Sequence, residues 1–192
     1  MQQGHLAGES DLRCWLEEQL HYGPIRVEAT VLRHMIVAAE HHQTEVLEYW
    51  DAWLAASRES EELALQNSQM ARALWRLARE LVGNEALLGL LRSPSQYVTV
   101  LALLSVAAEL PAAEAIFTHI HSWLANLVIA GVRLIPLGQS AGQKLLWDLQ
   151  ELVEQVVEFA MSAVEEDLYA CSTGLALASV QHETLYSRLY RS

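Results

Sequence analysis

The sequence predicts an all-α protein, a single domain of roughly eight to ten packed helices. Apolar residues recur at helical spacing over nearly all of the 192 residues. Strand signals are weak, because the longest β-branched cluster is the short stretch 97–100 and alanine and leucine runs follow it. No fixed-period repeat and no linker is visible, so we expect residues 1–192 to form one domain.

The first half of the chain predicts five helices. Ser10 and Asp11 are the expected N-caps of the first helix, which Gly23-Pro24 ends, and a second covers about 27–39. Thr44 is the expected cap of a third. A fourth runs from about 60 to 82, and a short fifth covers about 85–92. The predicted apolar stripe of the fourth helix consists of Leu63, Met70, Leu74, Leu77 and Leu81.

The second half predicts a buried helix over 96–109 and a long apolar helix over 112–134, closed by Pro111 and Pro136. A further helix starts at Ser140, and a last one follows a turn at 171–174. The stretch 115–132 is 18 residues long without a formal charge, which meets the length criterion for a membrane span. It contains His, Ser, Thr and Asn side chains, so we expect a core helix instead.

Composition excludes several classes of protein. The formal net charge is −12, and Lys144 is the only lysine beside eleven arginines. An acidic chain without a basic stripe is a poor ligand for nucleic acid or for an anionic membrane. Cys14 and Cys171 fit neither a disulfide framework nor metal-ligand spacing, and the N-terminus lacks the pattern of a signal peptide. We therefore expect a cytoplasmic protein that binds neither nucleic acid nor membranes.

The stretch IPLGQSAGQK, residues 135–144, looks like a phosphate-binding loop but fails the test for one. A P-loop has the spacing G-x-x-x-x-G-K-[ST] and follows a strand. Here Gly138, Gly142 and Lys144 have the wrong spacing, no Ser or Thr follows the lysine, and a helix precedes. We interpret the stretch as a connection between helices, in which Pro136 ends one helix and Gly138 gives backbone freedom.

No motif indicates catalysis or a cofactor. The histidine pairs 41–42 and 119–121 lack the i, i+4 spacing that places two ligands on one helix face. Adjacent carboxylates are typical of solvated helix faces, and no nucleophile motif is present. The six tryptophans fit apolar stripes of the core. The sequence therefore predicts a protein that is not an enzyme, with no cofactor and no metal.

The C-terminal stretch HETLYSRLYRS, residues 182–192, differs in composition from the rest of the chain. It carries tyrosine and arginine and has no acidic side chain after Glu183. Tyr and Arg dominate protein interfaces, whereas a frayed tail is the alternative interpretation. Helical spacing places on one side His182, Leu185, Tyr186 and Leu189.

Two stretches together resemble the urease accessory protein F (UreF) family. The first is RLIPLGQSAGQKLL, residues 133–146, and the second is the C-terminal stretch 182–192. Weaker support comes from SWLANLV and NSQMARAL, at 122–128 and 67–74. Members of the family usually begin with a segment ending in Phe-Ser-x-Ser-x-Gly-Leu-Glu. Nothing of that kind precedes GHLAGES here, so we expect that segment to be absent.

The resemblance implies an all-helical scaffold in place of an enzyme. Such a scaffold pairs with urease accessory protein D (or H), as a homodimer within the complex, and recruits the nickel-carrying GTPase, accessory protein G, for delivery of nickel to apo-urease. The alternative is a regulator of that GTPase, with Arg133 or Arg191 acting on the nucleotide in trans. The expected partner-binding residues are Arg133, Pro136, Gln139, Gln143, His182, Glu183, Tyr186, Arg188, Tyr190 and Arg191.

Overall fold

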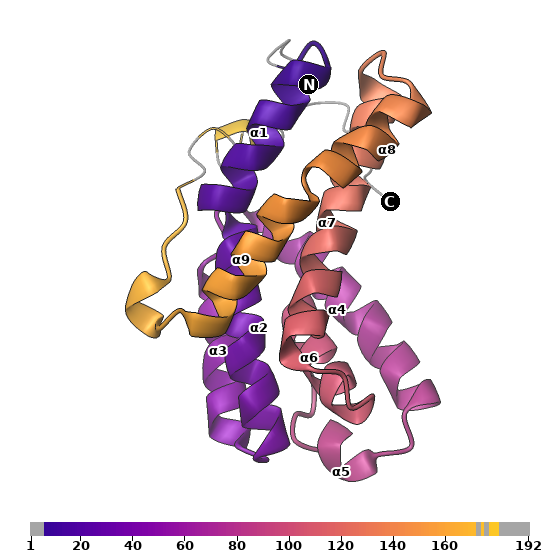
Figure 1. Cartoon of the computed structure of the whole chain (residues 1–192). Helices are drawn as coiled ribbons and strands as arrows, with labels where there is room; N and C mark the ends of the chain where they lie inside the picture. Colours follow the sequence, from indigo (N-terminus) through magenta and orange to yellow (C-terminus); the bar gives the residue numbers. More distant parts are fainter. Residues whose placement is uncertain (1–5, 172–173, 175–176, 181–192) are drawn as a thin grey trace. The chain divides into compact units, whose positions relative to one another are not determined.

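A computed structural model describes residues 6–171, 174 and 177–180 (Figure 1). Within these residues the chain forms nine α-helices, one short 3-10 helix and no strand, which confirms the all-α class. Contacts divide the chain into two compact units, residues 1–33 with 111–171 and residues 34–110 with 172–192. That residues 1–192 form one domain stays a prediction.

The first unit contains α1 (Glu9–Tyr22), the first part of α2 (Pro24–Glu40), α7 (Ala112–Leu134), α8 (Gln139–Asp148), α9 (Gln150–Ser162) and the 3-10 helix η1 (Glu165–Asp167). Helix α8 turns back alongside α7, and α9 continues from α8 and packs against both α7 and α1 (Figure 1). The buried side chains of the first unit include Leu12, Leu16, Leu20, Ile116, Ile120, Leu124, Leu145 and Val153.

Helix α7 is long and apolar enough to cross a membrane by length and composition, a test that core helices of soluble proteins also pass. It buries one stripe, which includes Ile116, His119, Ile120 and Leu124, and it packs against α8 and α9. Its other side is exposed. This one-sided burial is the pattern of an amphipathic core helix.

The second unit contains the rest of α2, α3 (Thr44–Ala56), α4 (Glu61–Leu81), α5 (Glu85–Leu88) and α6 (Tyr97–Ala107). Helix α6 packs against α4 and α5 (Figure 1). The buried side chains of the second unit include Met35, Ile36, Leu47, Leu54, Val98, Val100 and Leu103. The start of α6 is held by the Asp51 carboxylate of α3, which accepts hydrogen bonds from the Ser95 and Gln96 amides and from the Thr99 hydroxyl.

The predicted stripe of α4 is wrong in its direction. Met70, Leu77 and Leu81 are exposed, whereas Ala71 and Ala78 are the buried residues of this helix. Alanine lets a neighbouring helix approach closely, and α6 is the helix that packs here. The larger apolar side chains are consequently left at the edge of the contact.

The helix ends agree only in part with the starts and caps predicted from the sequence. Helix α4 begins where the sequence predicted, and the Ser60 hydroxyl caps it by accepting a hydrogen bond from the Leu63 amide at 3.2 Å. The predicted caps of the first and third helices are wrong, because Gly8 and Gln43 occupy those positions without a side-chain cap. The helix predicted from Ser140 onward is two helices, α8 and α9, which meet at Leu149.

Candidate functional site

The predicted motif at residues 133–146 covers the end of α7, a short loop and most of α8. Helix α7 ends when the Ile135 amide donates to the Gly131 carbonyl at 2.8 Å, just before Pro136. The buried Ile135 side chain holds the loop on the unit. Helix α8 then begins at Gln139, with Gly138 at its N-cap.

Gly142, and not Gly138, is the glycine that this corner of the fold requires. Gly138 has φ −69° and ψ 151°, an extended conformation open to any residue, and a Cβ there would meet nothing within 4 Å. The predicted need for backbone freedom at Gly138 is therefore wrong. A Cβ at Gly142 would lie 2.8 Å from Cγ2 of Val132 and 3.2 Å from Cγ1 of Val128, so α8 packs closely on α7.

The far end of α8 is fixed to α1 by an ion pair. Nη2 of Arg13 lies 2.5 Å from Oδ2 of Asp148, and both side chains are partly exposed. With Leu145 buried in the middle of the helix and Gly142 against α7, α8 presents a fixed outer face. Fixed elements hold binding residues more accurately than free loops do.

Four of the predicted partner-binding residues lie on α8 or on the segment that leads into it. Arg133, Pro136, Gln139 and Gln143 are all exposed, and Gln139 and Gln143 are one helical turn apart on α8. The remaining predicted residues lie outside the described part of the chain: His182, Glu183, Tyr186, Arg188, Tyr190 and Arg191. The structure therefore shows that the first group is exposed, and the role of both groups in partner binding stays a prediction.

Trp147 belongs to the same face and was missed by the sequence reasoning. It follows Gln143 by one further turn, and 82% of its side chain is exposed. All six tryptophans are in the described part of the chain, and of them Trp50 is buried, Trp147 is exposed and the others are half-buried. The prediction of core tryptophans is thus wrong for Trp147. Its place at i+4 from Gln143, directly after the quoted motif, is the signal that could have found it.

We define the α8 face as Arg133, Pro136, Gln139, Gln143 and Trp147. Lys144 is exposed beside it, so the face adds two cationic side chains to an otherwise acidic protein. Amide side chains, a large aromatic ring and arginine are groups that bind another protein surface. No nucleophile and base are paired among these residues, so their chemistry suits the binding of another protein.

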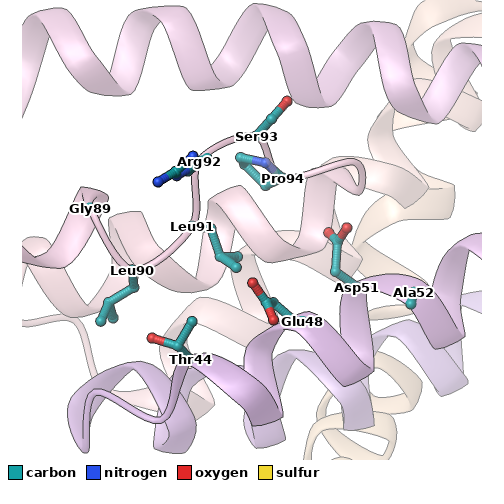
Figure 2. A pocket seen from close by; sticks show the side chains of 10 residues that line it. All are labelled: Thr44, Glu48, Asp51, Ala52, Gly89, Leu90, Leu91, Arg92, Ser93 and Pro94. Atoms are coloured by element: carbon teal, nitrogen blue, oxygen red, sulfur yellow. The ribbon is translucent and has the colours of Figure 1, made fainter.

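The second unit has a pocket of about 490 Å³ between α3 and the loop 89–94 (Figure 2). Glu48 and Asp51 face this loop, which carries Arg92. The Asp51 carboxylate is occupied by four hydrogen-bonded groups at the start of α6, including the Ser95 hydroxyl at 2.6 Å. Asp51 therefore serves the fold, and the pocket offers no assembled reactive group among its lining residues.

Several histidines in the described part of the chain have structural contacts. Nε2 of His119 lies 3.2 Å from Oε2 of the Glu28 carboxylate, and both side chains are largely buried. His121 stacks on Phe117, and Nδ1 of His41 lies 2.8 Å from the Val37 carbonyl. Over the described part of the chain, no group of three or more His, Cys, Asp or Glu side chains is arranged to hold a metal ion.

Comparisons with known proteins agree with the motifs. A family model described as UreF matches residues 6–150. The chain is 41% identical to the urease accessory protein UreF of Trichormus variabilis and 40% identical to that of Nostoc sp., each alignment covering 100% of this chain and 84% of the relative. The protein of the same name from Janthinobacterium sp. is 35% identical over 100% of this chain and 86% of its own length.

Proposed function

Since the chain belongs to the UreF family of urease accessory proteins, we propose that it is the scaffold on which the nickel-delivery complex of urease assembles. It binds accessory protein D/H, forms a homodimer within that complex and recruits the nickel-carrying GTPase, accessory protein G, to apo-urease. It works in the cytoplasm, without a cofactor and without catalysis of its own. Nickel is the cargo of the complex.

The observation that carries this proposal is the α8 face. An exposed tryptophan and two glutamines lie on a helix that Gly142 and the Arg13–Asp148 pair fix in place. Exposing so large an apolar side chain to water is unfavourable, and burial under a partner removes that cost. Tryptophan is also among the residue types most often found at the energetic centres of interfaces.

The α8 face is tested by capture experiments with the full chain. Trp147→Ala is expected to weaken capture of a partner roughly thirtyfold, because truncating a central anchor costs about 2 kcal/mol. The matched control is Tyr22→Ala, which removes another exposed aromatic side chain from the same unit. Equal capture by Trp147→Ala and the unmodified chain, of D/H and of the GTPase alike, would show that this face is not an interface.

The C-terminal segment is the second proposed contact and lies outside the described residues. Its leucines and tyrosines would meet an apolar surface, while Arg188, Tyr190 and Arg191 would reach a polar or acidic rim. Deleting 185–192 is then expected to abolish capture of D/H and to leave most of the helix content. A truncated chain that binds D/H as well as the full chain does would remove the segment from the interface. One that unfolds would place these residues in the core.

The alternative function, regulation of the GTPase, has one observation in its favour. Arg133 is exposed near the end of α7, as an arginine that acts on another protein must be. An arginine acting in trans raises GTP hydrolysis by about 10³–10⁵-fold. Single-turnover hydrolysis by the GTPase, with and without this protein, separates the two functions: an acceleration that Arg133→Lys abolishes supports regulation, and an unchanged rate supports the scaffold alone.

A further inference from the structure

The exposed side of α4 carries three of the eleven arginines of the chain. Arg72, Arg76 and Arg79 follow one another at i, i+4 and i+7, so they lie along one line of the helix. All three side chains are exposed, and within the described part of the chain none of them takes part in a hydrogen bond or ion pair. Residues 63–79 include no acidic side chain, although the chain has 24 of them. The middle of α4 is therefore a locally positive surface on an acidic protein.

A second line of exposed side chains on α4 is apolar. Met70, Leu77 and Leu81 are 44%, 47% and 74% exposed, and they follow one another at i, i+7 and i+11. The arginine line and the apolar line border the exposed half of the helix, whereas the buried Ala71 and Ala78 lie on the other half. Exposed leucine and methionine beside a row of unpaired charges indicate a surface that another molecule covers.

The strip between the two lines is suited to a helix. Ala73 is exposed there, about 60° around the helix from Arg76 and about 40° from Leu77. A small residue between larger ones lets a second helix approach closely. The same arrangement is already used on the inner side of α4, where Ala71 and Ala78 are buried and α6 packs.

We propose that the exposed side of α4 binds an acidic amphipathic helix of a partner protein. Apolar side chains of that helix pack on the apolar line, and its carboxylates pair with the arginine line, since the planar guanidinium group matches a carboxylate. We call this surface the α4 face, which consists of Met70, Arg72, Ala73, Arg76, Leu77, Arg79 and Leu81.

The net charge of the chain favours this partner over two others. Two copies of a chain of net charge −12 repel each other, and an anionic membrane repels the chain in the same way. An acidic helix that contacts only the α4 face meets the locally positive part of the surface. The partner is defined by its chemistry, so the proposal does not depend on the proposed function or on the α8 face.

The test measures how a labelled synthetic peptide binds the full-length protein, by fluorescence anisotropy. The peptide is as long as α4, with leucine at positions a and d of each heptad, glutamate at e and g, and alanine or glutamine elsewhere; the glutamates keep it from pairing with itself. Arg76→Glu should weaken binding roughly tenfold, because a repulsive pair replaces an attractive one. Leu77→Gln should also weaken binding roughly tenfold, because it removes an apolar contact at the centre of the face.

Each variant has a matched control in the same compact unit. Arg92→Glu makes the same change of net charge at an exposed arginine of the loop 89–94, outside α4. Val37→Gln makes an exposed apolar side chain of α2 polar, and that side chain is 43% exposed. Both controls should leave the affinity unchanged. A peptide with lysine in place of glutamate should lose no affinity through Arg76→Glu, because that substitution removes a repulsion.

Three results would overturn the proposal. The first is that the acidic peptide does not bind the unmodified chain. The second is that Arg76→Glu weakens binding no more than Arg92→Glu does. The third is that Arg76 supports a different association: binding to vesicles that contain phosphatidylserine would assign the α4 face to a membrane, and self-association of the isolated chain would assign it to a second copy.

Discussion

Substituting alanine for Gly142 tests how closely α8 packs on α7. The added methyl group would lie 2.8 Å and 3.2 Å from methyl carbons of Val132 and Val128. Valine in a helix has one strongly preferred χ1 rotamer, so these side chains have little room to turn away and α8 itself must shift. Overpacking of this kind costs about 1–3 kcal/mol, and alanine recovers roughly 1 kcal/mol of helix propensity. We expect a net loss of about 1 kcal/mol in the free energy of unfolding.

Denaturant unfolding and a thermal melt measure this change. A loss of about 1 kcal/mol lowers the melting temperature by roughly 2–4 °C in a protein of this size. Gly138→Ala is the matched control, since a Cβ there meets no atom within 4 Å, and its effect should stay within about 0.5 kcal/mol. A Gly142→Ala protein as stable as the unmodified one would refute the reasoning, because it would show that α8 is free to move outward.

Three further predictions concern single side chains. Lys144→Ala should leave the affinity of the isolated chain for GTP unchanged in equilibrium dialysis, because residues 135–144 do not form a phosphate-binding loop; GTP binding that depends on Lys144 would contradict this. Asp51→Ala should lower the free energy of unfolding by about 2–3 kcal/mol, because it leaves the Ser95 and Gln96 amides without their acceptor; a loss below about 0.5 kcal/mol would contradict the role given to Asp51. Burial raises the pKa of Tyr97 above its usual 10.0, so the unfolded chain releases this proton first and the free energy of unfolding should fall as the pH rises above that value. In denaturation measured against pH, Tyr97→Phe should make this fall less steep. An unchanged slope would exclude Tyr97 as its source.

Helical periodicity was sufficient to predict the class of the fold and most of its elements. Local signals such as Gly23-Pro24 and Pro111 act within a few residues, so they can be read directly. The break at Leu149 could not be predicted in this way. The apolar pattern continues across it, and the change of direction depends on how α8 and α9 each pack against α7.

Which side of a helix is covered is decided by its neighbours. The leucines of α4 form a clear stripe in the sequence, yet α6 packs where Ala71 and Ala78 allow a close approach. Trp147 is a similar case, since an apolar ring in a helical pattern predicts burial unless the surrounding helices are known. Arg133, Gln139 and Gln143 were predicted through the family motif, and the structure adds the exposed surface on which they lie.

The central claim is that this protein is a scaffold, and affinity capture of its partners tests it most directly. The tagged full chain is incubated with accessory protein D/H and with the GTPase, first singly and then together. We expect the tagged chain to retain D/H, and to retain the GTPase when D/H is also present. Capture of neither protein by the full chain would contradict the scaffold. Failure to retain the GTPase, together with a changed rate of GTP hydrolysis, would also contradict the scaffold and would favour the regulator.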